Sequence, residues 1–378
     1  MTDICLVTPR YPPTHAGGGE VSAQLLAEQL KRSEEIGNIT VVSFDGKNTE
    51  IINDVKVARL ADLPTYPYTI PNEIAYRRLI DYELECDVIH AYNMDLHPAV
   101  GRISERLQIP SVATLNSYSL MNRQAVNISP SIERKLYELT LLRAERPRLK
   151  RQMRKIDMFL PLSRPVKEKY QEWGLSDCEF EVIPNMIDPN FASSMKRTSS
   201  ERGNLVYVGH LRPSKGVKYL VDAMNHLPTN YSLTVVGGGP EKEHLEARAS
   251  SSSASERISF TGKIPYEKIS QVFDDSDVFV HPGVWPEPFG RTILEAMQSG
   301  LPVVATNTGG PSEIVPQPDL LCSPSDPSSL SKAIKYAYKN QDQIGQENIE
   351  YVKDCFHPDN ILTDIIKIYS NISKKRAV

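Results

Sequence analysis

The sequence predicts an α/β protein with two doubly wound domains, each a parallel sheet with helices on both faces. Short apolar runs alternate with helical patterns through most of the chain, which is typical of parallel sheets covered by helices. This alternation occurs as two series, divided by a stretch rich in Pro, Asn and Ser. With 378 residues, the chain is too long for one ordinary core and long enough for two.

The first series predicts one domain over residues 1–184. Its apolar runs predict strands at Ile4–Val7, Ile39–Ser43, Val88–His90, Ser111–Leu115 and Met158–Leu162. The helical patterns between them predict helices at Val21–Lys31, Glu73–Tyr82, Ala99–Leu107, Ile132–Lys155 and Pro165–Trp173.

The second series predicts another domain over residues 205–357, after a linker at residues 185–204. Its strands are expected at Leu205–Gly209, Ser232–Gly237, Ile258–Phe260, Val278–His281 and Pro302–Thr306. Residues 358–378 carry a last helical pattern of apolar residues, which predicts a final amphipathic helix that packs on one domain and can cross to the first.

Composition narrows the class of protein. The 43 Lys plus Arg and 47 Asp plus Glu give a net charge of −4, which argues against nucleic-acid binding through bulk charge. The five scattered cysteines form no Cys-x-x-Cys pair, so neither a disulfide framework nor a zinc site is expected. The N-terminal residues have the pattern of a strand and not of a signal peptide, and no apolar run approaches the length of a membrane span. A cytoplasmic location is therefore expected.

Two glutamates surround a predicted helix start in the segment Trp285–Met297. Pro288 and Gly290 exclude a regular helix through its first half, so Glu287 belongs to a loop and Glu295 to the second helical turn. Free amides at the start of a helix form an anion site. A diphosphate there would repel carboxylates, so each glutamate is better suited to hydroxyl groups on either side of it. A ligand made of a sugar, a diphosphate and a ribose has this layout.

Four loops that follow predicted strands hold further candidates. The Gly17–Gly19 loop permits close approach of a ligand to backbone amides, although a tight turn also needs glycine. The loop after Leu205–Gly209 holds three potential cations that could neutralise a diphosphate, which are His210, Arg212 and Lys215. The Gly237–Gly239 loop lacks the spacing of a dinucleotide fingerprint. Residues Lys263 and Ile264 could present backbone groups to a base.

A basic segment stands out from this slightly acidic chain. Residues Arg143–Lys155 hold seven cations and a single acid, which fits either weak contact with a membrane surface or a solvated helix face interrupted at Pro147. His90, at the end of a predicted strand, could enter a cleft or be a structural residue.

The chain resembles the retaining glycosyltransferases of family 4, also described as glycosyl transferases group 1. The resemblance lies in Val208–Gly216, Val236–Pro240, Phe260–Gly262, His281–Thr306 and Gly309–Glu313, and in Tyr11–Glu20, Asp87–His90 and Val182–Asn185. It covers nearly the whole chain. It implies a GT-B fold, in which two Rossmann-like domains face each other across a cleft, and transfer of a hexosyl unit from a UDP- or GDP-sugar to a glycan or lipid-linked saccharide.

The resemblance also implies roles for residues, without a metal ion or other cofactor. Glu295 would accept hydrogen bonds from the ribose, Glu287 would hold the transferred sugar, and Lys215 would stabilise the departing diphosphate. The remaining donor-binding positions are Gly17, Gly18, Gly19, His210, Arg212, Lys263, Ile264, Pro288, Phe289, Gly290, Arg291 and Thr292. The leaving diphosphate oxygen would take the acceptor's proton on the face where attack occurs.

Three positions depart from the family pattern. His210 replaces an arginine, so Lys215 would share its task with Arg212 or with a protonated His210. Asn116 occupies the place of a histidine near the transferred sugar, where it can orient a hydroxyl but cannot act as a base. Met186 follows Asn185 where the family has glycine.

Three other functions remain open on the sequence. A nucleotide-sugar epimerase of the same fold would interconvert nucleotide sugars. A glycoside hydrolase would use Glu287 and Glu295 as nucleophile and acid and would need no nucleotide. A nucleotide-binding protein with little activity would bind without turnover.

Overall fold

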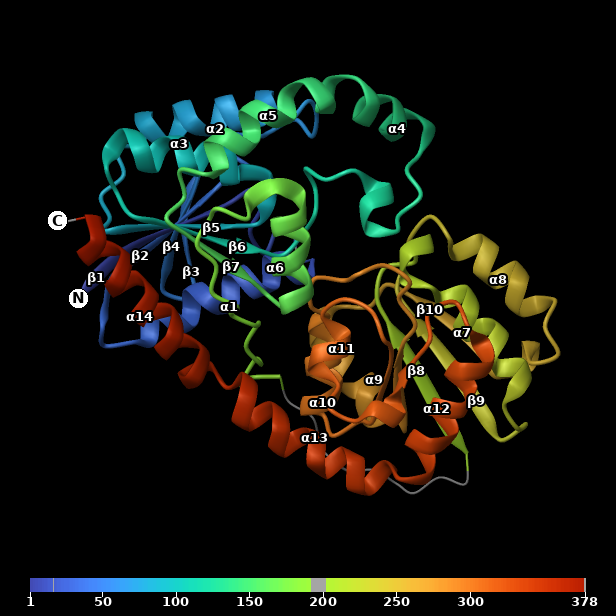
Figure 1. Cartoon of the computed structure of the whole chain (residues 1–378). Coiled ribbons are helices and arrows are strands. Elements are labelled where there is room, and N and C mark those ends of the chain that lie inside the picture. The colour runs from blue at the N-terminus through green and yellow to red at the C-terminus, as the bar shows by residue number, and fades with distance from the viewer. Residues whose placement is uncertain (16, 192–201, 377–378) are drawn as a thin grey trace. The chain divides into compact units, whose positions relative to one another are not determined.

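The chain forms two compact units in a computed structural model that describes residues 1–15, 17–191 and 202–376 (Figure 1). Unit 1 comprises Met1–Met186 and Pro358–Val378, and unit 2 comprises Ile187–His357. Much of the expected linker, residues 192–201, lies outside the described residues.

Unit 1 contains a seven-stranded sheet in the order β3-β4-β2-β1-β5-β6-β7, parallel except where β3 pairs with β4. Its strands are β1 (Thr2–Thr8), β2 (Ile36–Ser43), β3 (Thr49–Ile52), β4 (Val55–Arg59), β5 (Val88–Tyr92), β6 (Ser111–Leu115) and β7 (Met158–Pro161). Its α-helices are α1 (Gly18–Arg32), α2 (Thr69–Asp81), α3 (His97–Leu107), α4 (Ile132–Leu139), α5 (Leu141–Met153), α6 (Arg164–Tyr170) and α14 (Pro358–Arg376). The five predicted strands are confirmed, and β3 and β4 are additional.

Unit 2 contains a parallel six-stranded sheet in the order β10-β9-β8-β11-β12-β13. Its strands are β8 (Gly203–Val208), β9 (Tyr231–Val236), β10 (Ile258–Gly262), β11 (Val278–His281), β12 (Val303–Thr306) and β13 (Leu321–Cys322). Its α-helices are α7 (Val217–Ala223), α8 (Lys242–Ser250), α9 (Ile269–Asp274), α10 (Arg291–Gln298), α11 (Pro311–Ile314), α12 (Pro327–Lys339) and α13 (Gln341–Phe356).

The helix predicted over Ile132–Lys155 is wrong as a single element. It divides into α4 and α5 at Thr140, whose φ of −112° and ψ of −94° are not helical. Pro147 was expected to interrupt the helix but lies inside α5. The 3.6-residue pattern continues across Thr140, so periodicity alone could not place the break.

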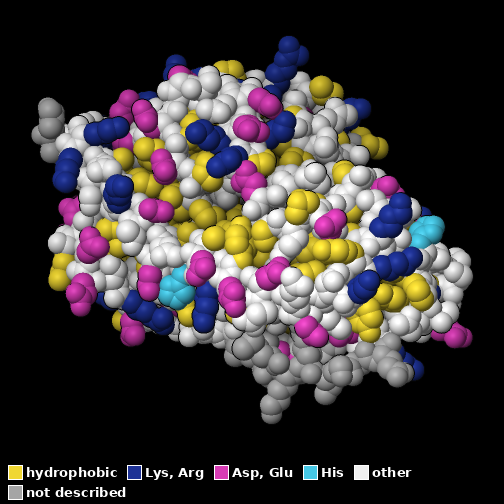
Figure 2. All heavy atoms as spheres, turned by 60° about the horizontal axis from the view of Figure 1, so that its bottom comes forward, with side chains coloured by type: hydrophobic (Ala, Val, Ile, Leu, Met, Phe, Trp, Pro, Cys, Tyr) yellow, Lys and Arg dark blue, Asp and Glu magenta, His cyan; other side chains and the backbone are white. Residues whose placement is uncertain are grey.

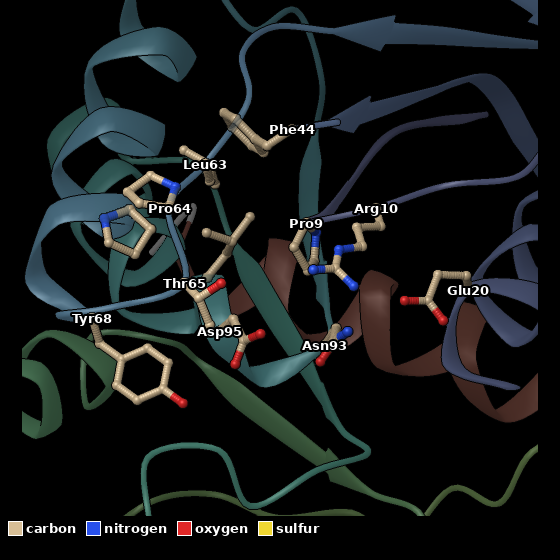
Figure 3. A pocket seen from close by; sticks show the side chains of 12 residues that line it. Pro9, Arg10, Glu20, Phe44, Leu63, Pro64, Thr65, Tyr68, Asn93 and Asp95 are labelled. Atoms are coloured by element: carbon tan, nitrogen blue, oxygen red, sulfur yellow. The ribbon is translucent and has the colours of Figure 1, made fainter. Parts of the chain in front are cut away.

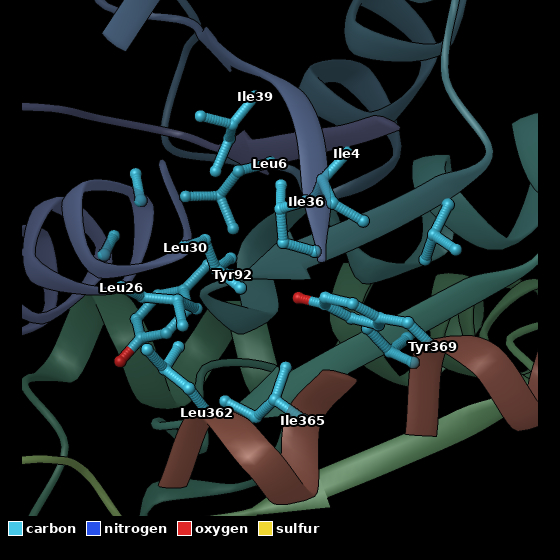
Figure 4. Close-up of a cluster of buried hydrophobic side chains, with 14 of the residues drawn as sticks. Ile4, Leu6, Leu26, Leu30, Ile36, Ile39, Tyr92, Leu362, Ile365 and Tyr369 are labelled. Atoms are coloured by element: carbon cyan, nitrogen blue, oxygen red, sulfur yellow. The ribbon is translucent and has the colours of Figure 1, made fainter. Parts of the chain in front are cut away.

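The last helix, α14, completes the core of unit 1. Its apolar residues pack with those of α1, β1 and β2 in one buried cluster, and Figure 4 shows Leu362 beside Leu26, with Tyr369 farther along α14. Arg376 near its end donates to the carbonyl of Ile109 at 2.7 Å. The prediction of an amphipathic helix that packs on a domain is therefore confirmed.

Charges of both signs lie interspersed on the face of the molecule shown in Figure 2. Basic and acidic side chains alternate there, so this face carries no extended field of a single sign.

His90 is a structural residue of unit 1. It is fully buried, with Nδ1 2.7 Å from the Tyr369 hydroxyl and Nε2 2.7 Å from the Thr114 hydroxyl. Burial, with a smaller effect of His97, lowers the pKa of His90 to about 3 from 6.5. The imidazole is therefore neutral in the folded protein.

We expect unit 1 to lose stability in mild acid because of His90. The unfolded chain binds the proton near pH 6.5 and the folded chain only near pH 3, so stability falls as the pH drops through this window. At pH 5 the loss from His90 is about 2 kcal/mol. Urea unfolding at pH 7, 6 and 5, followed by Trp173 in a Trp285→Phe background, measures it. His90→Gln should remove about half of the pH dependence, because burial also lowers the pKa of His97 to about 3 and that residue remains. Replacing the exposed His244 with Gln should not change the slope. Equal slopes in the two variants would contradict the assignment to His90.

Candidate active site

Every candidate residue of unit 2 follows one of five adjacent strands. The strands β10, β9, β8, β11 and β12 are neighbours in the sheet, and because they are parallel their carboxyl ends share one edge. Lys263, Gly237–Gly239, His210–Lys215, Glu287 and Gly309 lie in the loops that leave this edge. Ligands of open α/β sheets bind at such an edge.

The two glutamates lie where the sequence predicted them. Glu287 is in the loop between β11 and α10, and Glu295 is in the second turn of α10. Gly290 caps this helix with φ of 116° and ψ of 65°, a left-handed conformation that glycine adopts readily.

Glu287 forms a charged cluster with Lys215 and His281. Its Oε1 accepts from the Lys215 ammonium at 2.5 Å, and its Oε2 lies 3.0 Å from Nε2 of His281. Burial alone would raise the pKa of Glu287, but the charge of Lys215 and then that of His281, with their hydrogen bonds, hold it well below its usual range. The structure thus joins Lys215 and Glu287, to which the resemblance assigns roles at the diphosphate and the transferred sugar, with Glu287 ionised.

Glycines allow the loops of this cluster to approach each other. A Cβ on Gly216 would lie 1.9 Å from the carbonyl oxygen of Pro282, and Gly216 has a φ of +66°. A Cβ on Gly309 would lie 2.6 Å from the backbone nitrogen of Glu287, and the amide of Gly310 donates to the Glu287 carbonyl at 2.7 Å. Backbone contact therefore fixes the position of Glu287, a role that sequence reasoning did not assign to these glycines.

Glu295 is buried and already engaged. Its Oε1 accepts from the Tyr266 hydroxyl and from Nε of Arg291, each at 2.9 Å. Burial raises the pKa of Glu295, against the charge of Arg291 and the two hydrogen bonds. Sequence reasoning missed Tyr266, because it comes from the loop after β10 and belongs to no motif.

Three cations surround His210. Burial lowers its pKa, and the charges of Arg212, Lys263 and Lys215 lower it further. A neutral imidazole is therefore favoured in the ligand-free protein, which weighs against the expectation of a protonated His210. The imidazole lies on the glycine loop, since a Cβ on Gly239 would be 2.6 Å from its Nδ1.

In unit 1 the structure brings the glycine loop and Asn116 together. Gly17 precedes α1, and Asn116 follows β6 at the same edge of the sheet. The Cβ position of Gly19 is 3.3 Å from Nδ2 of Asn116. Oδ1 of Asn116 is buried without a hydrogen-bond partner among the described residues, so it is available to a ligand hydroxyl.

A pocket of about 120 Å³ opens beside this loop in unit 1 (Figure 3). Sequence reasoning did not predict it. Its lining includes Arg10, Glu20, Thr65, Tyr68, Asn93 and Asp95. Burial raises the pKa of Asp95, against a hydrogen bond with Ser119 and the charges of Arg10, Arg123 and Arg134. The pocket thus offers several hydroxyl-binding groups.

The chain has two doubly wound α/β units, as in the GT-B fold. The second unit carries a lysine, two glutamates and a glycine-capped helix at the carboxyl edge of its sheet. Residues 16–191 match the family model of Glycosyltransferase Family 4, and residues 193–353 match that of Glycosyl transferases group 1. The chain is a glycosyltransferase with the GT-B fold.

One relative supports this class, and two solved structures share the fold. An uncharacterized glycosyltransferase of Methanocaldococcus jannaschii is 25% identical over 390 residues, 97% of this chain and 97% of its own. Sucrose-phosphate synthase from Thermosynechococcus elongatus has a TM-score of 0.78 at 21% identity, over 98% of this chain and 99% of its own. HepE from Anabaena in complex with UDP has a TM-score of 0.75 at 19% identity, over 98% of this chain and 100% of its own. The expected glycosyltransferase class and GT-B fold are confirmed.

Proposed function

We propose that this glycosyltransferase belongs to family 4 and moves a hexosyl unit, with retention and without a metal ion, from a UDP- or GDP-sugar to a glycan or lipid-linked saccharide. The Lys215–Glu287 contact carries the proposal, because it places a cation suited to a diphosphate against a carboxylate suited to sugar hydroxyls. The complexes of HepE with UDP and with UDP-glucose support a nucleotide-sugar donor.

In the proposed mechanism, positioning and electrostatics do most of the work. Glu295 accepts from the ribose, and the amides near Phe289 and Gly290 hold the sugar. Lys215 and Arg212 stabilise the departing diphosphate. Glu287 orients the sugar and stabilises positive charge near the anomeric carbon, while a diphosphate oxygen takes the acceptor's proton. Asn116 orients a hydroxyl, and the polar pocket of unit 1 receives the acceptor.

One observation favours a second candidate, a glycoside hydrolase. The pKa of Glu287 is lowered and that of Glu295 is raised, which is the pattern of a nucleophile and an acid. However, Glu295 is only 3% exposed, and two donors share its Oε1, so it is poorly placed to protonate a leaving group. Transfer is therefore the better-supported function, and cleavage of oligosaccharides without any nucleotide would reverse this preference.

A thermal-stability screen with UDP, GDP and their sugars tests the donor. A ligand at 100 times its Kd should raise the free energy of unfolding by about 2.7 kcal/mol. Sugar transfer to saccharide acceptors, with and without EDTA, and the anomeric configuration of the product by NMR then test activity, metal independence and retention. Interconverted nucleotide sugars would indicate the epimerase, and binding without turnover would indicate a nucleotide-binding protein.

We expect Glu295→Ala to weaken nucleotide binding about tenfold, because the ribose loses its acceptor. Calorimetric titration with the nucleotide found in the screen measures this change. Tyr266→Phe is the matched control, since it removes one donor to Glu295 but keeps the carboxylate. Unchanged affinity in Glu295→Ala, or an equal loss in Tyr266→Phe, would contradict the assignment to the ribose.

A further inference from the structure

Helix α4 carries its charged residues inside and its apolar residues outside. Arg134 and Glu138 are each only 7% exposed, whereas Ile132, Leu136 and Leu139 are 89%, 63% and 62% exposed. These three residues follow the i, i+4, i+7 spacing of one helix face. The apolar stripe of α4 therefore faces solvent, the reverse of an ordinary surface helix.

The buried side of α4 cannot rotate outward without breaking a polar network. Arg134 donates from Nε to Glu138 at 2.8 Å, from a terminal nitrogen to the carbonyl of Ser119 at 2.9 Å, and from the other to the Tyr68 hydroxyl at 3.2 Å. Its guanidinium also lies 5.3 Å from the ring centroid of Tyr137. Such a network fixes the orientation of the helix, so the exposure of its apolar face is a feature of the fold.

The exposed apolar residues are concentrated in one place. Among the described residues, ten large hydrophobic side chains are exposed, and four of them lie within Ile132–Leu141. Tyr66, a fifth, has its ring centroid 5.1 Å from that of Tyr137 on α4. Concentrated exposed apolar side chains mark contact surfaces, whereas scattered ones need no explanation.

Basic residues follow the apolar stripe in the sequence, on α5. Arg143 and Arg151 are exposed. Three other cations have acidic partners: Arg148 lies near Glu73, Arg154 is bonded to Asp177, and Lys155 is bonded to Glu105. An apolar stripe that leads into exposed arginines has the composition of a helix that lies in a lipid interface.

We propose that α4 and the start of α5 form a docking surface for an anionic lipid bilayer. Ile132, Leu136, Leu139 and Leu141 enter the boundary of the acyl chains, and Arg143 and Arg151 contact the anionic head groups. No helix among the described residues has the length and apolar character needed to cross a membrane. The proposed contact is peripheral, and it is independent of the donor, acceptor and mechanism proposed above.

Sedimentation with vesicles tests the proposal. The full chain should bind vesicles that contain phosphatidylglycerol more tightly than pure phosphatidylcholine vesicles, and added salt should weaken binding. The Ile132→Ser, Leu136→Ser, Leu139→Ser triple variant should lower the partition coefficient at least tenfold. Arg143→Gln and Arg151→Gln should each lower it roughly fivefold. Ile51→Ser, at an apolar residue of β3 that is 76% exposed, should leave it unchanged.

Circular dichroism and thermal unfolding of each variant show whether the fold is retained. Equal binding to both kinds of vesicle, absence of binding at low salt, or an equal loss in Ile51→Ser would overturn the proposal. So would a dimer of the wild-type chain that the triple variant abolishes, because α4 would then be an interface between copies.

Discussion

Replacing Glu287 with glutamine is expected to lower the rate of sugar transfer about 100- to 1000-fold while changing nucleotide affinity little. Glutamine keeps the size of the side chain but removes the charge that stabilises positive charge near the anomeric carbon, and losses of this size follow removal of one such group. The variant also leaves the Lys215 ammonium without its carboxylate partner. Steady-state transfer rates and calorimetric nucleotide affinities separate the two effects.

The exposed Glu267 provides the matched control for Glu287→Gln. Glu267→Gln removes a carboxylate from the same unit and should retain the wild-type rate. Because Lys215 and Glu287 are in contact, Lys215→Met combined with Glu287→Gln should cost less than the sum of the single changes. A Glu287→Gln rate within about threefold of wild type would remove Glu287 from the catalytic residues.

Much of the fold was predictable because both sheets are buried and parallel apart from the pairing of β3 with β4. Strands such as β5 and β6 are entirely buried, so they appear in the sequence as apolar runs. The hairpin of β3 and β4 was missed, since its strands are short and β3 is half exposed. The Asn53-Asp54 pair was a sequence signal for this hairpin. These residues have φ of 48° and 64° and form a turn suited to a hairpin.

The candidate site was predictable only in its local parts. Pro288 and Gly290 place Glu287 in a loop and Glu295 in a helix, and both placements are confirmed. The contact of Glu287 with Lys215 spans 72 residues and depends on β8 lying next to β11, which periodicity does not specify. His281 was likewise assigned only to the end of a strand, and its contact with Glu287 depends on the return of the following loop.

Replacing Gly216 with alanine is expected to destabilise unit 2 by about 3 kcal/mol or more. The added Cβ would lie 1.9 Å from the carbonyl oxygen of Pro282, and backbone cannot yield as a flexible side chain can. Each kcal/mol corresponds to about 2–4 °C in the Tm of a domain of this size. Thermal unfolding followed by Trp285 in a Trp173→Phe background reports unit 2.

Gly262 separates the steric contact from backbone strain. Its φ of +73° is close to the +66° of Gly216, but a Cβ there would meet no heavy atom within 4 Å. Gly262→Ala should therefore cost only the left-handed conformation, about 1 kcal/mol. Equal destabilisation in the two variants would mean that the contact with Pro282 is unimportant.

The expected difference matters for function, because Gly216 follows Lys215 directly, and a backbone displaced from Pro282 carries the Lys215 ammonium away from Glu287. Transfer should then fall in Gly216→Ala even at temperatures where unit 2 remains folded.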